Sequence, residues 1–136
     1  MTDFSLKIVT PHGVKYDGQI QELVVRTVDG DMGILAGHTN CVAPLGMGRA
    51  TVIIDGNYRY GACIGGMVCV VDGAVTLLPT TFEWAEDIDT TRADNSEQRA
   101  REILGDKTST STDLKLAEAR LKRALIRQNV ATYKPK

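Results

Sequence analysis

The sequence predicts an all-β sandwich or flattened barrel followed by an α-helical hairpin. Of the 13 glycines, every one except Gly105 precedes residue 85. Short aliphatic runs separated by Asp-Gly pairs fill that first part, whereas charged residues with helical spacing fill the remainder. In this chain of 136 residues we therefore expect a β domain over residues 1–84 and a two-helix hairpin over residues 85–136.

Alternation of apolar and polar residues marks the first strand. Phe4, Leu6 and Ile8 alternate with polar side chains, which indicates a strand that buries one face. No helical segment separates the strand-like runs, so βαβ units are excluded and a sandwich or barrel is favoured. The core candidates are Val24, Val52, Ile54, Ile64, Val68, Val70, Val75 and Leu77.

Two Asp-Gly pairs predict tight hairpins in the β domain. Asp55-Gly56 and Asp72-Gly73 each separate two strand-like runs and have the composition of two-residue hairpin turns. They predict that Ala50–Ile54 pairs with Asn57–Ala62 and that Met67–Val71 pairs with Ala74–Leu78.

Two helices are expected in the last part of the chain. The first is predicted over Ala85–Leu104 and ends at Gly105, because acidic residues gather at its start, where the helix dipole favours negative charge. The second is predicted from a cap at Thr112 or Asp113 to about Tyr133.

The two helices should form an antiparallel hairpin with a weak seam. We expect a flexible connection over Asp106–Ser111, and Pro135 should stop the second helix. The seam uses Ala and Ser where a stable bundle would use Leu, so docking of the helices should be marginal. The predicted apolar positions are Ile88, Ser96, Ala100 and Ile103 on the first helix, and Leu114, Ala117, Leu121, Ala124 and Leu125 on the second.

Charge is placed unevenly along the chain. The formal net charge is -1, which gives no overall attraction to nucleic acid or to an anionic membrane. From Thr108 onward the chain carries a local charge of about +5, so this segment should meet an acidic partner. The cations are Lys115, Arg120, Lys122, Arg123, Arg127, Lys134 and Lys136, and the acids are Asp113 and Glu118.

The compartment is expected to be the cytosol. The first residues lack a basic, apolar leader, and no apolar run reaches the length of about 18 residues that a membrane span needs. The sequence has 3 cysteines, an odd number that argues against a disulfide framework. A zinc site of His38 with Cys41, Cys63 and Cys69 has unfavourable spacing, and we expect these cysteines to be buried small hydrophobes.

A short acidic and basic pattern at the start of the hairpin suggests an anion site. Asp89 and Arg92 lie three residues apart, and Arg99 lies two helical turns beyond Arg92 on the same side. The simpler interpretation is an ordinary surface salt bridge between Asp89 and Arg92. An anion site requires arginines of both helices to converge.

Five short motifs are distributed over essentially the whole chain. The most specific segment is Gly30-Asp31-x-Gly33-Ile34-Leu35-x-Gly37-His38. The other segments are Phe4-x-Leu6-x-Ile8-Val9-Thr10-Pro11, Tyr16-Asp17-Gly18, Ile88-Asp89-x-x-Arg92-Ala93 and Leu121-Lys122-Arg123-Ala124. Together these motifs resemble one known family, the ε subunits of bacterial F-type ATP synthases.

The resemblance implies a non-catalytic rotor subunit of the central stalk. Its β-sandwich would bind the γ subunit and the membrane c-ring, coupling the catalytic head to proton transport at the cytoplasmic face of the bacterial plasma membrane. Its regulatory hairpin would extend into the catalytic α/β subunits and inhibit ATP hydrolysis. No catalytic residue, metal or required cofactor is implied, and association with the membrane would occur only through the complex.

The resemblance also implies a regulatory nucleotide site. ATP would bind the folded hairpin, with the involvement of Mg²⁺ left open. The implied nucleotide-binding residues are Glu83, Ile88, Asp89, Arg92, Ala93, Arg99, Arg123 and Arg127. We expect Arg120, Lys122 and His38 to contact partner subunits.

A nucleic-acid-binding module is the alternative function. The basic second helix and an OB-like β domain would suit that class of protein. Stacking platforms need exposed aromatic rings, however, and most of the 2 Phe, 4 Tyr and 1 Trp are expected to be buried. We therefore expect no nucleic-acid partner.

Overall fold

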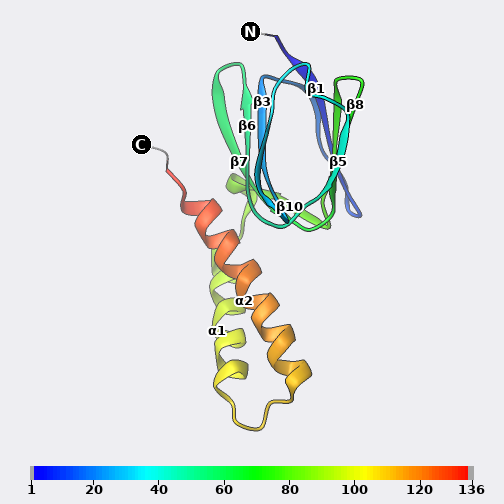
Figure 1. The fold of residues 1–136 in the computed structure, drawn as a ribbon. Helices are drawn as coiled ribbons and strands as arrows, with labels where there is room; N and C mark the ends of the chain where they lie inside the picture. Colours follow the sequence, from blue (N-terminus) through cyan, green and yellow to red (C-terminus); the bar gives the residue numbers. More distant parts are fainter. Residues whose placement is uncertain (1, 135–136) are drawn as a thin grey trace. The chain divides into compact units, whose positions relative to one another are not determined.

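The computed structural model describes residues 2–134, and the chain divides into two compact units at the Ala85–Glu86 junction (Figure 1). The first unit contains two five-stranded sheets and the second contains two long helices, which confirms the predicted fold class. The strands are β1 (Phe4–Thr10), β2 (Gly13–Ile20), β3 (Glu22–Thr27), β4 (Gly30–Ile34), β5 (Cys41–Pro44), β6 (Met47–Ile54), β7 (Asn57–Ile64), β8 (Met67–Val71), β9 (Ala74–Leu78) and β10 (Thr81–Trp84). Pro135, predicted to stop the second helix, lies outside the described residues.

The two sheets enclose the core of the first unit. One sheet has the strand order β2-β1-β9-β8-β5 and the other has the order β10-β7-β6-β3-β4. Neighbouring strands are antiparallel except that β1 runs parallel to β9, with Leu6 opposite Val75. The β1 side chains alternate as the sequence predicts, since Phe4, Leu6 and Ile8 are buried. This pair joins the first strand of the domain to the ninth, and the local sequence pattern did not predict it.

Both predicted hairpins are confirmed. Ile54 pairs with Asn57, and Val71 pairs with Ala74, so each Asp-Gly pair forms the two-residue turn. Asp55 and Gly56 have φ of 51° and 78°. Positive φ at both turn positions matches the right-handed twist of the flanking strands.

Six of the core candidates are buried and two are not. Val52, Ile64, Val68, Val70, Val75 and Leu77 are all buried, whereas Val24 and Ile54 are only half-buried. In β3, Leu23 and Val25 face the core. Because side chains alternate along a strand, Val24 must point to the other face of the sheet. The apolar run around Val24 left this choice of face open.

An aromatic cluster closes the C-terminal end of the sandwich. The Trp84 ring packs edge-on against Phe82 at 4.9 Å and against Tyr16 at 6.1 Å between ring centroids. Its indole Nε1–H donates to the carbonyl oxygen of Lys15 at 3.1 Å, and the Arg59 guanidinium lies 3.7 Å from the ring centre. These contacts hold the last strand of the domain at a fixed position in the sandwich.

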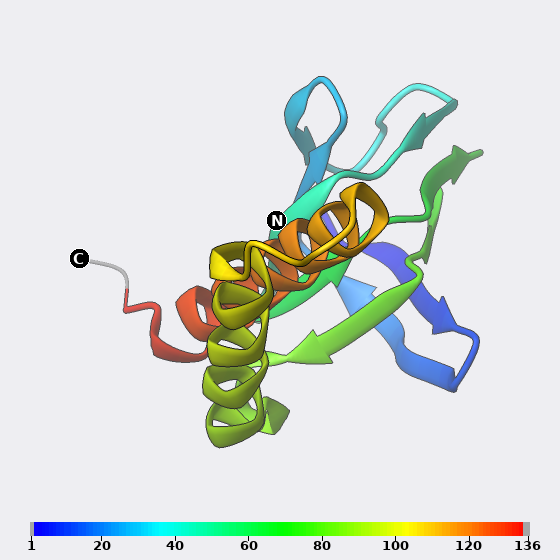
Figure 2. The ribbon, with the colours of Figure 1, turned by 90° about the horizontal axis from the view of Figure 1, so that it is seen from below.

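The second unit is a helical hairpin. After a 3₁₀ turn at Ala85–Asp87, α1 (Thr90–Gly105) and α2 (Ser111–Thr132) lie side by side and are joined by a short loop (Figures 1 and 2). The first helix was predicted to begin at Ala85, which is wrong, because α1 begins at Thr90. Residue Asp89 is the N-cap of α1 in extended conformation, and its side chain accepts a hydrogen bond from the backbone N–H of Arg92.

The cap of the second helix also differs from the prediction. Thr110 is the N-cap, and its Oγ1 accepts from the backbone N–H of Asp113 at 3.1 Å. The Asp113 carboxylate in turn accepts from the Thr110 backbone N–H, which completes a capping box. The helix therefore begins at Ser111, ahead of the predicted caps Thr112 and Asp113, because this reciprocal pair satisfies two otherwise unpaired N–H groups.

Alanine forms the seam of the hairpin. Ala93 and Ala100 on α1, and Ala117 and Ala124 on α2, are at most 3% exposed. Each pair is two helical turns apart, so its members share a face. Val130 of α2 is also buried, at 1% exposed, and Leu125, predicted for the seam, is 40% exposed. The predicted seam positions Ala100, Ala117 and Ala124 are confirmed, and the marginal docking of the helices stays a prediction.

The loop between the helices has its own hydrogen bonds. The Asp106 carboxylate accepts from the backbone N–H and hydroxyl of Thr108, and these bonds lower the pKa of Asp106. The Ser109 hydroxyl donates to the carbonyl oxygen of Ile103 at 2.8 Å. This segment is therefore a hydrogen-bonded turn, which the polar composition alone did not indicate.

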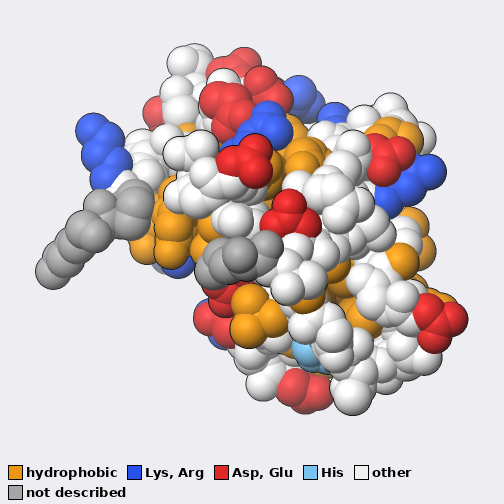
Figure 3. Space-filling view, turned by 90° about the horizontal axis from the view of Figure 1, so that it is seen from above, with side chains coloured by type: hydrophobic (Ala, Val, Ile, Leu, Met, Phe, Trp, Pro, Cys, Tyr) orange, Lys and Arg blue, Asp and Glu red, His pale blue; other side chains and the backbone are white. Residues whose placement is uncertain are grey.

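Hydrophobic side chains also reach the surface. Figure 3 shows such side chains among charged and polar groups on one face of the molecule. Val28, Val42 and Tyr58 of the sandwich are about 60% exposed. Of the seven aromatic residues, Phe4, Phe82 and Trp84 are buried, whereas Tyr16, Tyr60 and Tyr133 are half-buried and Tyr58 is exposed. The expectation that most rings are buried is therefore wrong. Over residues 2–134, neither helix is apolar and long enough to traverse a lipid bilayer.

Candidate anion-binding site

A groove between the two helices brings together part of the predicted nucleotide site. Its volume is about 470 Å³. One wall is α1 with its N-cap, and the other carries a single arginine of α2. The lining residues are Asp89, Thr91, Arg92, Asn95, Ser96, Arg99 and Arg120. Three of the predicted residues, Asp89, Arg92 and Arg99, therefore line one hollow.

Local helix geometry explains why these α1 residues converge. Arg92 and Arg99 are seven residues apart, which is close to two full turns, so their side chains leave the helix on the same side. Both side chains are exposed. Asn95 and Ser96 occupy the turn between them and add neutral polar groups to the same wall.

Asp89 acts on the backbone in this structure. Its Oδ1 accepts from the Arg92 backbone N–H at 3.0 Å and thereby caps the first turn of α1. A salt bridge to the Arg92 guanidinium was the simpler interpretation of this pair, and the observed contact is to the Arg92 main chain instead. The cap leaves the Arg92 guanidinium able to face the groove.

The second helix supplies a different arginine from those expected. Arg120, predicted as a partner contact, lines the groove. Arg123 and Arg127 are half-buried on α2 and do not contribute to the lining of this hollow. Arg120 and Arg127 are seven residues apart and leave α2 on the same side, so they differ mainly in their position along the helix axis, which the sequence pattern did not resolve.

The remaining predicted residues have other surroundings. Ile88 and Ala93 are buried, with exposed fractions of 9% and 3%. Glu83 lies in β10 of the sandwich unit, opposite Ala62 of β7. His38 follows β4, where its Nδ1 lies 2.8 Å from the Thr39 carbonyl oxygen, and Lys122 is exposed on α2.

The groove has the chemistry of an oxyanion site. Arg92, Arg99 and Arg120 place three guanidinium groups against one carboxylate, that of Asp89. Guanidinium groups are planar and always charged, and they bind phosphate or carboxylate oxygens through paired N–H donors. None of the lining residues is aromatic, so the phosphate chain of a ligand is the part that this groove is suited to bind.

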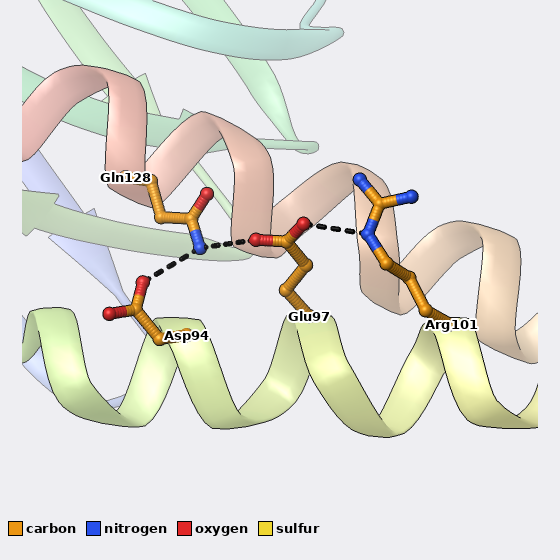
Figure 4. A network of polar contacts seen from close by, with 4 residues as sticks. All are labelled: Asp94, Glu97, Arg101 and Gln128. Atoms are coloured by element: carbon orange, nitrogen blue, oxygen red, sulfur yellow. Dashed lines mark hydrogen bonds and ion pairs between the residues drawn. The ribbon is translucent and has the colours of Figure 1, made fainter.

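A second polar network joins the helices on another face of α1. The side-chain amide of Gln128 donates to Asp94 Oδ1 at 2.9 Å and to Glu97 Oε1 at 2.8 Å (Figure 4). The Arg101 Nε–H donates to Glu97 Oε2 at 2.7 Å. Hydrogen bonds from Gln128 and Arg101 lower the pKa of Glu97. We call these four residues the Gln128 network.

The expectation that the cysteines are buried is confirmed for one of the three and wrong for the other two. Cys63 is 3% exposed, and burial raises the pKa of its thiol to about 12. Cys41 and Cys69 are half-buried, and all three are free. Within residues 2–134, no three His, Cys, Asp or Glu side chains gather closely enough to form a candidate metal site.

Comparison with protein families covers both units. The ATP synthase Delta/Epsilon chain β-sandwich domain matches residues 3–85, and the corresponding long α-helix domain matches residues 86–132. This chain belongs to the ATP synthase Delta/Epsilon family. It is 38% identical to the ATP synthase epsilon chain of Ruminococcus albus over 98% of this chain and 100% of that one. It is 40% identical to the epsilon chain of Bacillus cytotoxicus over 98% and 100% of the two chains.

Solved structures share the fold of this Delta/Epsilon family member. A chain in the Euglena gracilis mitochondrial ATP synthase, described with OSCP, F1 and the c-ring, gives a TM-score of 0.77 at 22% identity and covers 90% of this chain and 77% of that one. A chain of the Tetrahymena thermophila central stalk and c-ring gives 0.64 at 14% identity, covering 94% and 96%. The strand and helix arrangement is therefore shared despite low identity.

Proposed function

We propose that this chain is a non-catalytic subunit of the central stalk of an F-type ATP synthase. Relatives named ATP synthase epsilon chain match it over nearly the full length of both proteins, and this full-length match is the observation that carries the proposal. In this role the sandwich binds the γ subunit and the c-ring and couples the catalytic α/β head to proton transport. The complex would lie at the cytoplasmic face of a bacterial plasma membrane.

The helical hairpin would act as an inhibitor with two states. The folded hairpin permits turnover, and the extended hairpin places the basic α2 against acidic surfaces of the catalytic subunits. The small seam supports this proposal, because the buried side chains of the two helices are four alanines and Val130, which remove little apolar surface from water. A hairpin with so small a seam can open at low cost.

ATP would stabilise the folded state by binding the groove. A ligand at its own dissociation constant stabilises the bound state by about 0.4 kcal/mol, and a hundredfold excess stabilises it by about 2.7 kcal/mol. Shifts of this size change the populations of two states only when their free energies are nearly balanced. The weak seam supports such a balance. The catalytic sites are in other subunits in this proposal.

Removing the hairpin from the assembled enzyme tests the inhibitory role. Residues 87–136 would be deleted, which leaves the complete sandwich with its own core. We expect the truncated subunit to assemble and the rate of ATP hydrolysis to rise, with retained proton pumping as the control for coupling. An unchanged rate in a correctly assembled complex would contradict inhibition by the hairpin.

Calorimetric titration of the full chain with ATP tests the nucleotide site. We expect saturable binding that is lost in Arg92→Ala. Trp84 is only 4% exposed and is packed in the sandwich, so calorimetry is a safer readout than its fluorescence. Absence of heat from the unmodified chain at high ATP would contradict gating by the nucleotide and leave the stalk role intact.

A further inference from the structure

The buried alanines of the hairpin are flanked by two polar stripes of different chemistry. On α1, helical spacing places Arg92 and Arg99 on one side of the alanines and Asp94 and Glu97 on the other. A second hollow, of about 590 Å³, is lined by Asp94 and Glu97, and among the described residues it shares no lining residue with the arginine groove. The two stripes can therefore contribute separately to closure of the hairpin.

One residue of α2 makes two hydrogen bonds to the acidic stripe. The Gln128 Nε2 lies 2.9 Å from Asp94 Oδ1 and 2.8 Å from Glu97 Oε1 (Figure 4). Ionised carboxylates only accept hydrogen bonds, so an amide nitrogen with two N–H groups suits the position between them. Hydrogen bonds to charged acceptors are stronger than those between neutral groups. Separation of the helices breaks both bonds at once, because a single side chain donates them.

The α1 side of this contact is held in place by a neighbour on the same helix. The Arg101 Nε–H donates to Glu97 Oε2 at 2.7 Å, which leaves Oε1 to accept from Gln128. Asp94 and Glu97 are three residues apart on one helix face, so their like charges repel. The Gln128 N–H groups lie between these charges and offset the repulsion in the closed hairpin. Moving α2 away restores the repulsion in full.

We propose that Gln128 is a latch that holds the hairpin closed when no ligand is bound. This inference rests on the two-state hairpin proposed above and identifies a contribution to closure that needs no nucleotide. The helices bury four alanines and Val130, so two hydrogen bonds to charged groups are a substantial part of the free-energy difference between the folded and extended states. Loss of the latch shifts the population toward the extended hairpin.

Amide hydrogen exchange of the isolated full chain without ATP, followed by mass spectrometry of its peptides, tests the latch. Gln128→Ala should speed exchange in the α1 peptides about tenfold, since opening exposes their amides and two hydrogen bonds to charged groups no longer oppose it. Peptides of the sandwich should exchange as in the unmodified chain, which controls for folding. Asn129→Ala is the matched control, because it removes an exposed carboxamide from the next position of α2 and should leave exchange unchanged.

Two further variants test whether the contact with the carboxylates is the cause. Gln128→Glu keeps the length of the side chain but replaces the donors with a third carboxylate, so exchange in α1 should be faster than in Gln128→Ala. In the double variant Asp94→Ala/Gln128→Ala, the fold-change in exchange should be smaller than the product of the two single fold-changes, because both substitutions remove the same hydrogen bond.

The outcomes separate this inference from the proposed function. Unchanged exchange in Gln128→Ala, or equal acceleration in Asn129→Ala, would overturn the latch whatever the assembled enzyme does. In the assembled enzyme, Gln128→Ala should lower the rate of ATP hydrolysis, because more hairpins are extended. Faster exchange in the isolated chain with an unchanged hydrolysis rate would support the latch and count against inhibition by the hairpin.

Discussion

The two units of this molecule differ in the size of the apolar side chains that each buries in its own interior. The sandwich buries large side chains such as Leu6, Ile8, Leu77 and Phe82, each at most 2% exposed. The two helices of the hairpin bury four alanines and Val130. Full burial of one Val, Leu, Ile or Phe contributes roughly 1.5–3 kcal/mol, whereas each methylene-sized group contributes about 0.8 kcal/mol. One chain thus joins a unit with large buried side chains to a unit whose buried side chains are mostly small.

The same difference appears in the polar contacts. Trp84 of the sandwich donates to a backbone carbonyl within a packed aromatic cluster. The hairpin depends on its caps and on the Gln128 network, in which Asp94 and Arg101 are exposed to water and Glu97 and Gln128 are half-buried. Exposed hydrogen bonds contribute less to net stability because water competes for the same groups. Substitutions should therefore have graded effects in the two units.

The largest effect is expected in the sandwich core. Phe82→Ala removes a ring that is 2% exposed and leaves a cavity beside Trp84. The free energy of unfolding should fall by about 3–5 kcal/mol. Chemical denaturation followed by Trp84 fluorescence measures this change, because Trp84 is the single tryptophan and lies in the sandwich. A loss below 1 kcal/mol would contradict the view that large-side-chain burial dominates this unit.

A smaller effect is expected at Gly61, which lies beside the Phe82 ring. A Cβ placed on Gly61 would lie 2.3 Å from Phe82 Cζ, so Gly61→Ala forces the ring to shift. Overpacking of this kind costs about 1–3 kcal/mol. In the double variant Gly61→Ala/Phe82→Leu, the loss of unfolding free energy should be smaller than the sum of the losses in the two single variants. Strict additivity in the same denaturation assay would show that Phe82 is not the cause.

In the hairpin, the N-cap of α1 should give the next effect. Asp89→Ala removes the acceptor for the Arg92 backbone N–H and should reduce the stability of α1 by about 0.5–2 kcal/mol. Asp89→Asn retains an acceptor oxygen and should keep most of the helix. Thermal melts followed by circular dichroism at 222 nm compare the two. Equal destabilisation would mean that the charge of Asp89, rather than its capping bond, supports the helix.

The smallest effect is expected from acid titration of the hairpin. The pKa of Glu97 is lowered from its ordinary 4.5, and that of Asp106 from its ordinary 3.8. Each carboxylate therefore adds stability above its unfolded-state pKa, and this stability is lost as the pH falls through the folded-state pKa. Helix melts from neutral pH to about pH 3 should show a decline below about pH 4.5. The Gln128 side-chain amide lowers the pKa of Glu97, so Gln128→Ala should make the loss of helix stability at acid pH smaller. If the variant and the unmodified chain gave the same pH profile, Glu97 would not be the cause of that loss.

Much of this organisation could be predicted from the chain alone. The alternation of Phe4, Leu6 and Ile8 and the Asp55-Gly56 turn depend on local backbone geometry, which the residue types nearly determine. The buried alanine positions of the hairpin were also predictable, because helical spacing places Ala100, Ala117 and Ala124 on fixed faces. Helix starts were less accurate, since Asp89 and Thr110 are caps whose roles depend on hydrogen bonds to the following turn.

The sequence by itself determined the two-part architecture, the hairpin turns and the clustering of arginines in the helical part. Only the tertiary structure decided that β1 pairs in parallel with β9, that Val24 faces away from the core, and that Arg120 lines the groove. The physical reason is common to all three. Local pattern specifies how a segment folds and which residues share its face, whereas the segment against which that face packs depends on contacts between residues far apart in the chain.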